Sequence, residues 1–220
     1  QGLLAAMIQT EFAGRIALVS SFGTEAAILL HMVASIEPGT PVILLDTGKL
    51  FGETLRYRDQ LIDHLGLTDV RSAIPDPQKI SELDPQGILW SQNPDLCCEI
   101  RKVDPLGPAL SGFDAWITGR KRYQGQRRAV LPVVEASGGR IKINPLASWS
   151  KEIIDEYFRE HSLPFHPLAE DGYLSVGCMP CSDRARPGED ARAGRWRGLE
   201  KDECGIHETP AGQSLTSSEL

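Results

Sequence analysis

The stretch RIALVSSFGT at residues 15–24 decides the fold of this chain. Its apolar part, residues 15–20, predicts a short buried strand, and residues 25–35 have the composition and length of a helix. A helix that starts directly after such a turn offers free backbone N–H groups and a positive dipole end to an anion. An ordinary strand–helix turn with Ser and Thr caps is the alternative. We interpret the turn as an anion-binding site formed by Ser20, Ser21, Phe22, Gly23 and Thr24.

The same alternation continues along the chain. Residues 42–45 predict a second buried strand, residues 51–65 a helix, and residues 70–74 a third strand. Strands and helices in this order predict an α/β fold: a twisted parallel sheet flanked by helices, with right-handed crossovers. Ligands bind beyond the carboxyl ends of such strands. The turn after the second strand therefore adds three candidate substrate-binding residues, Asp46, Thr47 and Gly48.

The middle of the chain is less regular. Residues 97–106 predict a helix that Pro105 and Pro108 interrupt, and residues 115–118 predict a strand that ends in a basic run. Residues 131–134 and 140–143 predict two strands paired across the turn at 137–139. Residues 151–160 predict an amphipathic helix, and residues 208–220 have the composition of a disordered tail.

Composition excludes several classes of protein. The net charge of −7 argues against a nucleic-acid-binding surface, because phosphate backbones require clustered cations. No apolar run approaches the ~18 residues of a membrane-spanning helix, and no signal peptide is recognisable. We expect a cytoplasmic protein with neither nucleic acid nor membrane as partner, whose natural N-terminus precedes Gln1.

Five cysteines form two tight pairs and a singleton. The pairs are Cys97-Cys98 and Cys178-x-x-Cys181, and Cys204 stands alone. Buried thiols, a vicinal disulfide, a four-thiolate zinc site and an iron–sulfur cluster are the alternatives for the pairs. Because adjacent Cα atoms lie only ~3.8 Å apart and their side chains diverge, two neighbouring thiolates fit separate corners of a four-iron cluster better than one ion. The spacing favours the cluster.

Seven motifs between residues 15 and 207 occur together. They are Ser21-Phe-Gly-Thr24, Leu45-Asp-Thr-Gly48, Cys97-Cys98-Glu-Ile-Arg101-Lys102, Gly119-x-x-Arg122-x-Gln124, Gly177-Cys178-x-Pro-Cys181, Arg192-x-Gly-Arg195-Trp196 and Glu203-Cys204-Gly205-x-His207. This combination resembles the iron–sulfur branch of the assimilatory sulfonucleotide reductases, the adenylyl-sulfate (APS) reductases.

The resemblance implies an adenine-nucleotide alpha-hydrolase fold like that of the PP-loop ATP pyrophosphatases. It implies a nucleotide- and cluster-binding domain over residues 1–187 and a flexible C-terminal segment over 188–220 that carries the nucleophile, Cys204. The implied activity is thioredoxin-dependent reduction of APS to sulfite and AMP through an S-sulfocysteine intermediate, and we expect a homo-oligomer. One [4Fe–4S] cluster would be bound by Cys97, Cys98, Cys178 and Cys181, with Lys102 beside it.

The chemistry favours a mobile nucleophile, because Cys204 must meet first the nucleotide and then a second thiol. We expect Lys121, Arg122, Arg192 and Arg195 to line the pocket and neutralise phosphate and sulfate. His207 would also reach the substrate, although a histidine in a tail is often simply exposed.

Other activities remain open. Reduction of the 3′-phosphorylated nucleotide (PAPS), or of both nucleotides, is the nearest alternative. An ATP pyrophosphatase would need a Ser-Gly-Gly-x-Asp-Ser-type loop, which this sequence lacks at residues 20–25. A cluster- or zinc-binding regulator would have no need of a Glu-Cys-Gly tail.

Overall fold

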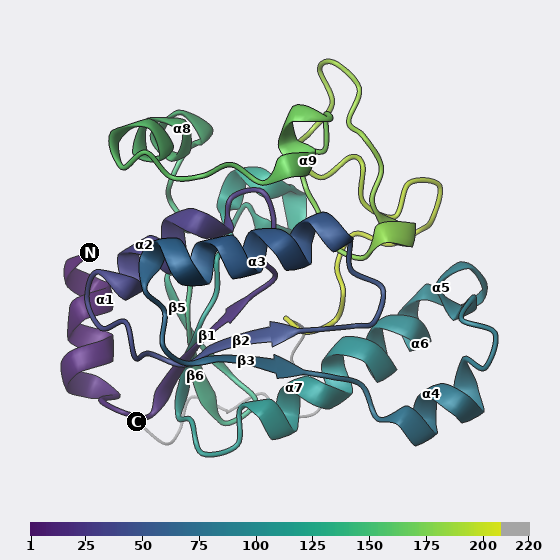
Figure 1. Ribbon diagram of the computed structural model, residues 1–220, viewed down its shortest axis with the longest axis horizontal. Coiled ribbons are helices and arrows are strands. Elements are labelled where there is room, and N and C mark those ends of the chain that lie inside the picture. Colours follow the sequence, from purple (N-terminus) through teal and green to yellow (C-terminus); the bar gives the residue numbers. More distant parts are fainter. Residues whose placement is uncertain (208–220) are drawn as a thin grey trace.

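The computed structural model describes residues 1–207, apart from the side chain of Gln126. Six strands form one sheet in the order β3-β2-β1-β4-β6-β5 (Figure 1). Five of them run parallel, and β5 pairs antiparallel with β6. The strands are β1 (Ile16–Ser20), β2 (Val42–Leu45), β3 (Val70–Ala73), β4 (Ala115–Ile117), β5 (Val134–Ser137) and β6 (Arg140–Ile143). The predicted α/β fold with a mostly parallel sheet is confirmed.

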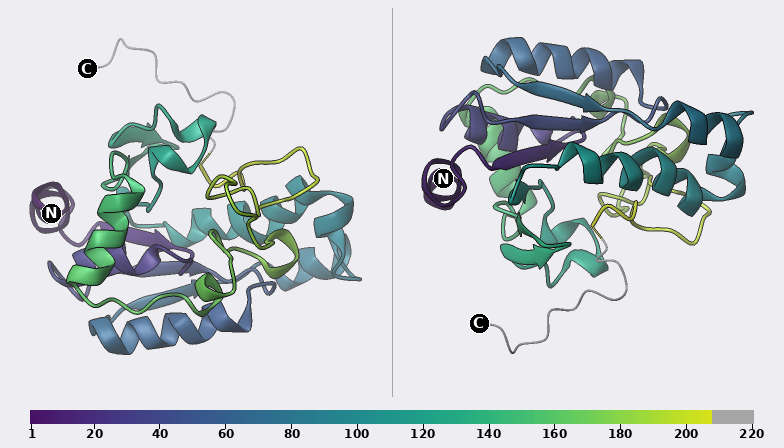
Figure 2. Two further views of the ribbon diagram at one scale, coloured as in Figure 1. Left: turned by 90° about the horizontal axis from the view of Figure 1, so that it is seen from above. Right: turned by 90° about the horizontal axis from the view of Figure 1, so that it is seen from below.

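Helices cover both faces of the sheet, and Figure 2 shows α3 and α7 on opposite sides of it. Leu18 and Leu44 pack toward α2 (Ala26–Ala34), α3 (Gly52–Leu65) and α8 (Lys151–Glu160). The alternate residues Val19 and Ile43 pack on the other face with Leu106, near α7 (Asp104–Ala109). Because both faces of β1 and β2 are buried, these strands are continuous apolar runs.

The remaining helices are short. At the N-terminus, α1 (Gly2–Ala6) continues into a π-helical turn (Met7–Glu11) and buries Leu4 and Ile8 in the core. Beyond β3 come α4 (Pro77–Leu83), α5 (Leu89–Gln92), α6 (Pro94–Cys98) and a π-helical turn (Glu99–Val103) that leads into α7. After α8, α9 (Pro167–Glu170) is followed by a 3-10 turn (Met179–Cys181), and two further 3-10 turns lie at Arg122–Gln124 and Gln126–Arg128. None of the helices in residues 1–207 has the length and apolar character needed to cross a membrane.

Two local predictions are wrong. The helical path from Pro94 continues through Pro105 and Pro108 to Ala109 instead of stopping at the prolines. Pro105 directly follows a π-helical turn whose last bond, from the Asp104 N–H to the Glu99 carbonyl, already departs from the i→i−4 pattern, whereas Pro108 lies inside α7. The first strand of the hairpin is Val134–Ser137 and shares only its first residue with the predicted range 131–134. Its position is set by a two-residue turn, in which Gly138 and Gly139 both take positive φ.

Candidate active site

A cavity of about 210 Å³ lies at the carboxyl ends of β1, β2 and β4. This is the edge where a parallel sheet binds its ligands. The C-terminal segment closes part of it, because Glu203, Cys204, Ile206 and His207 contribute to the wall. The sequence-predicted residues that line the cavity are Ser20, Ser21, Gly23, Thr24, Thr47, Lys102, Lys121, Cys178, Arg192, Arg195, Cys204 and His207.

The turn after β1 opens to this cavity. Ser20 Oγ accepts a hydrogen bond from the backbone N–H of Phe22 at 3.2 Å, and Thr24 Oγ1 donates to the carbonyl of Leu174 at 2.9 Å. Phe22 has a φ of +47° and its side chain is fully buried in the core. Of the five residues predicted to bind the anion, Phe22 therefore shapes the turn, and the other four line the cavity.

In the turn after β2, the two end residues and the middle residue have different contacts. Asp46 Oδ1 accepts from the backbone N–H of Gly48 at 3.1 Å, and neither residue lines the cavity. Thr47 does line it, and its Oγ1 lies 3.2 Å from Cys178 Sγ. Only Thr47 of this predicted trio is brought to the site, where it connects the sheet edge to the cysteines.

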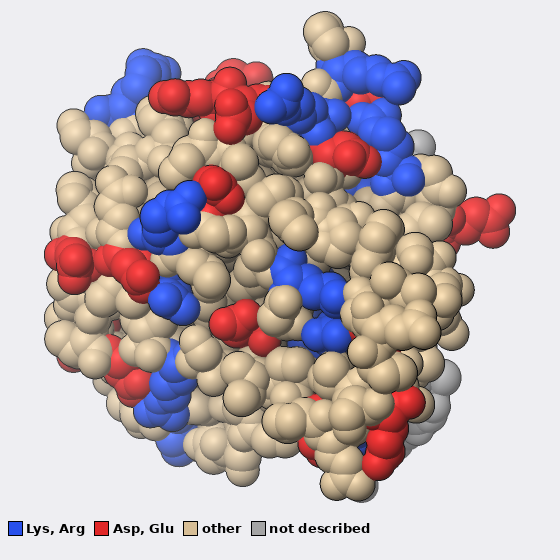
Figure 3. All heavy atoms as spheres, turned by 45° about the vertical axis from the view of Figure 1, so that its right-hand side comes forward, with Lys and Arg blue, Asp and Glu red and all other residues tan. Residues whose placement is uncertain are grey.

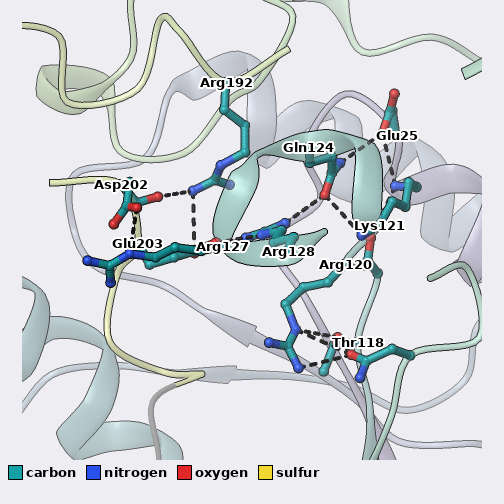
Figure 4. Close-up of polar contacts among 12 residues, drawn as sticks. Glu25, Thr118, Arg120, Lys121, Gln124, Arg127, Arg128, Arg192, Asp202 and Glu203 are labelled. Carbon is teal, nitrogen blue, oxygen red and sulfur yellow. Dashed lines mark hydrogen bonds and ion pairs between the residues drawn. The ribbon is translucent and has the colours of Figure 1, made fainter. Parts of the chain in front are cut away.

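The basic run after β4 covers residues 120–122, and only some of its side chains line the cavity. The Lys121 Nζ lies 2.9 Å from the carboxylate of Glu25 (Figure 4). Although burial favours the neutral acid, Lys121 and the Tyr123 hydroxyl hold the pKa of Glu25 below its ordinary value. Arg122 is not brought to the cavity, because its Nε donates to the carbonyl of Leu131 at 2.9 Å.

Sequence reasoning missed two arginines that line the cavity, Arg120 and Arg128. Arg120 Nη2 donates to Asn144 Oδ1 at 3.1 Å and contacts Glu135 of β5. Arg128 lies in a 3-10 turn with no regular pattern around it. Because Arg120 follows β4 closely, its position in the sequence indicated a place at the cavity. No local feature of the sequence indicated the same for Arg128.

Arg128 binds the C-terminal segment. Its Nη2 donates to Glu203 Oε2 at 2.9 Å and its Nε to Glu203 Oε1, which makes the pair bidentate (Figure 4). Arg192 Nη2 donates to the carbonyl of Asp202 at 2.7 Å and reaches Glu203 Oε2 at 3.3 Å. Burial raises the pKa of Glu203, but the hydrogen bonds and charge of Arg128, with Arg192, outweigh it and leave that pKa lowered. Glu203 is thus an ionised carboxylate held between two guanidinium groups.

Arg195 is held differently. Its Nε donates to the carbonyl of Cys181 at 3.2 Å, and its guanidinium lies over the Trp196 ring, 4.5 Å from the centroid. The guanidinium also lies against the Cα of Gly177, where a Cβ would come within 2.3 Å of Nη2. Arg195 lines the cavity, and among the described residues no carboxylate pairs with it.

The nucleophile candidate is placed at the cavity wall, and the histidine after it is packed against the sheet. Cys204 is partly buried and lines the cavity. The His207 ring stacks on Trp116 with a centroid distance of 5.8 Å and an interplanar angle of 7°. Burial, together with the charges of Arg120 and Arg128, lowers the pKa of His207 well below its ordinary value. The possibility of a simply exposed His207 is therefore wrong.

The four paired cysteines surround a second, smaller cavity. Cys97, Cys98, Cys178 and Cys181 all line it, and all four thiols are free. Burial is the main cause of a pKa above the ordinary value for Cys97, Cys98 and Cys181, and it raises that of Cys98 to about 11. Within residues 1–207, no three His, Cys, Asp or Glu side chains are grouped closely enough to hold a single metal ion.

Lys102 connects the two cavities, because its side chain lines both of them. Its burial alone would lower the pKa of the ammonium group, but the thiols of Cys178, Cys204 and Cys98 raise it above the ordinary value. A cation at this place shares one cavity with Cys204 and the other with the paired cysteines.

Residues 15–184 match the model of the phosphoadenosine phosphosulfate reductase domain. The chain belongs to this reductase family. Two bacterial family members are named adenosine 5′-phosphosulfate reductase. The enzyme of Mesorhizobium japonicum is 51% identical to this chain, and the alignment covers 95% of this chain and 82% of the relative. The enzyme of Streptomyces coelicolor is 43% identical, and the alignment covers 89% of this chain and 83% of the relative.

Solved structures agree on the fold. The phosphoadenylyl-sulfate (PAPS) reductase of Candida auris, crystallised with phosphate, superimposes with a TM-score of 0.67 at 25% identity, over 81% of this chain and 87% of that one. The FMN adenylyltransferase of Candida glabrata reaches 0.58 at 13% identity, over 92% and 74%. The reductase family member therefore has the predicted adenine-nucleotide alpha-hydrolase fold.

The family match stops at residue 184, before the segment that carries Cys204. The Mesorhizobium relative, by contrast, aligns with 95% of the chain. The predicted disordered tail at residues 208–220 lies outside the described residues, and the division into two domains stays a prediction.

Proposed function

We propose that this reductase family member reduces adenosine 5′-phosphosulfate to sulfite and AMP, in the cytoplasm, as a step of sulfate assimilation. The observation that carries the proposal is the position of Cys204. Its thiol lines the same cavity as the turn after β1 and the cations Arg192 and Arg195. The names of the relatives at 51% and 43% identity favour APS over PAPS as substrate.

In the first step the Cys204 thiolate attacks the sulfur of the sulfate group. The bond between that sulfur and the bridging phosphate oxygen breaks, AMP leaves with the electron pair, and Cys204 becomes an S-sulfonate. Both products carry negative charge on oxygen. Fixed donors such as Arg195 and Lys102 suit this step, because they need not reorganise while the charge develops.

In the second step a thioredoxin thiolate attacks Cys204 Sγ and expels sulfite. The second thioredoxin thiol then breaks the mixed disulfide and restores the free Cys204 thiol. The two electrons of the thioredoxin dithiol thus reduce sulfate sulfur to sulfite sulfur. Because thioredoxin is a protein, the segment that carries Cys204 must leave the cavity for this step.

We propose further that Cys97, Cys98, Cys178 and Cys181 hold one [4Fe–4S] cluster, which would place the chain in the iron–sulfur branch. Four free thiols around one cavity support this assignment. The cation Lys102 lines the same cavity and would offset the negative charge of thiolate ligands, whereas Arg101, also in its wall, is paired with Asp84 at 2.6 Å. When bound, such a cluster would supply charge and local order rather than the electrons of the reduction.

Mass spectrometry tests the mechanism. Incubation with APS and no thioredoxin should release one AMP per active site and add one SO₃ unit, which digestion should map to Cys204. Cys204→Ser should still bind APS but form no adduct, because a hydroxyl is a weaker nucleophile at neutral pH. Turnover by this variant, or an adduct on a paired cysteine, would refute the mechanism.

Two further measurements decide the substrate and the metal. Sulfite release from APS and PAPS, assayed side by side, should favour APS. Iron and acid-labile sulfide in anaerobically prepared protein should reach about four of each per chain, as the cluster requires. Stoichiometric zinc without sulfide would refute the cluster and leave the nucleophile assignment intact.

A further inference from the structure

Two cations of the active-site cavity are neutralised by carboxylates that belong to a helix start and a strand. Lys121 pairs with Glu25, the residue at the N-terminus of α2, and Arg120 pairs with Glu135 of β5. Glu25 precedes α2, whose residues lie in the core, and Glu135 is held in the ladder of the edge strand β5, so we expect both carboxylates to stay paired when a nucleotide arrives. Lys121 and Arg120 therefore carry little free charge for an incoming anion.

The other carboxylate partner in the cavity comes from the C-terminal segment. Glu203 binds both Arg128 and Arg192, and the side chains of all three are mostly buried, with exposed fractions of 12%, 10% and 16%. Residues 199–207 contain no helix or strand. Glu203 (Figure 4) is thus attached to a stretch that no backbone ladder fixes. It immediately precedes Cys204 in the sequence.

The geometry of this contact is also that of anion recognition. Two parallel N–H groups of one guanidinium bind a carboxylate in the same way as they bind a phosphate or sulfate. Arg128 presents this fork to Glu203, and Arg192 adds a third donor. Figure 3 shows basic side chains gathered in a hollow of the surface.

We propose that Glu203 is an internal ligand of the site formed by Arg128 and Arg192, and that an anionic group of the nucleotide displaces it. The inference rests on the proposed function. Two buried guanidinium groups without a partner would be costly, so either Glu203 or the substrate must neutralise them. The exchange keeps Arg128 and Arg192 neutralised both with and without bound nucleotide.

The exchange acts on Cys204 because the segment is held on both sides of it. Before Cys204 the Glu203 carboxylate contacts Arg128 and Arg192, and the Asp202 carbonyl accepts from Arg192. After it, His207 stacks on Trp116 and its carbonyl lies 3.5 Å from Lys142 Nζ. Gly205 lies between the two contacts with a φ of +84°, where the chain can turn without steric cost. Displacing Glu203 would remove the side-chain contacts directly before Cys204, leaving the Asp202 contacts on that side and the His207 contacts on the other.

Calorimetry with AMP tests the competition. Glu203→Gln removes the competing charge and should bind AMP at least about tenfold more tightly than the unmodified protein. Asp202→Asn is the matched control: it removes the same charge one residue away, where the pair with Arg127 is exposed, and should change AMP affinity less than about twofold. Unchanged or weaker AMP binding by Glu203→Gln would overturn the inference.

Alkylation of Cys204, mapped by mass spectrometry, gives a readout that does not depend on turnover. AMP should accelerate labelling of Cys204 in the unmodified protein and have little effect in Glu203→Gln, where labelling is already fast. AMP that slows labelling in the unmodified protein would contradict the displacement.

Controls separate this inference from the proposed function. Glu203→Ala should shift AMP affinity in the same direction, so misfolding of one variant leaves the other to decide, and cooperative unfolding identifies which is folded. Normal sulfite production from APS with unchanged AMP affinity in both variants rejects the inference alone. An unmodified protein that neither binds AMP nor makes sulfite rejects the proposed function.

Discussion

Gly177→Ala should weaken binding of the anionic substrate by displacing Arg195. An added Cβ would lie 2.3 Å from Nη2, 2.6 Å from Cζ and 2.7 Å from Nη1 of Arg195, all closer than real contacts allow. The backbone of Gly177 does not have the positive φ that disfavours alanine. Because the obstructed atoms are the far end of a long side chain, the guanidinium should swing away while the fold is kept.

The expected magnitude follows from the lost contact. A hydrogen bond to a charged group contributes about 1.5–3 kcal/mol, so affinity should fall about 10- to 150-fold. Calorimetry with APS and AMP in a Cys204→Ser background avoids turnover. Gly119→Ala is the matched control, because Gly119 lines the same cavity and its Cβ would meet only Leu29 Cδ2 at 3.7 Å.

The refuting result is equal affinity of Gly177→Ala and Gly119→Ala for both ligands. Arg195 would then not meet a substrate anion. Denaturant unfolding should show unchanged stability, and iron analysis should be run alongside, since Gly177 precedes Cys178.

Two further predictions concern stability. Gly194→Ala should lower the free energy of unfolding by about 1–3 kcal/mol in urea titrations, because its Cβ would lie 2.2 Å from the backbone oxygen of Asp183; unchanged stability would show that this contact relaxes freely. The second prediction concerns His166, whose pKa burial lowers to about 4. Its buried ring forms a hydrogen bond with Thr54 Oγ1 at 3.0 Å and accepts another from the Leu168 N–H. As pH falls below 6.5, His166 becomes protonated in the unfolded chain but stays neutral in the folded protein. The free energy of unfolding should therefore fall by about 2 kcal/mol between pH 7 and pH 5 because of this residue. His166→Asn keeps a side-chain acceptor at the start of α9 and should show a shallower loss over this range; an identical pH dependence would refute the assignment.

The sequence predicted the elements whose signals are local. The apolar runs at β1 and β2 and the amphipathic pattern of α8 needed no knowledge of distant contacts, because burial on both faces or on one face dictates these patterns directly. The hairpin was misplaced for the opposite reason. Its first strand is partly exposed and carries Glu135 and Ser137, so it has no apolar run to mark it.

In the site, the sequence identified the residues with distinctive chemistry or spacing. The structure places all four paired cysteines around one cavity and Cys204 in the wall of the other, which Cys178 also lines, while their roles stay predictions. The sequence could not predict contacts that depend on which way a side chain points. Lys121 and Arg122 are neighbours in one basic run, yet one side chain lines the cavity and the other binds the Leu131 carbonyl.

The sequence by itself determined the strand–turn–helix order, and with it the edge of the sheet where the larger cavity lies. Only the tertiary structure decided which charges meet there. Arg128 and Glu203 are 75 residues apart, and no periodicity relates them. His207 and Trp116 come together only when the C-terminal segment packs across β4. Local patterns follow from the burial of each element, whereas ion pairing follows from which long side chains share a desolvated space, and the complete fold creates that space.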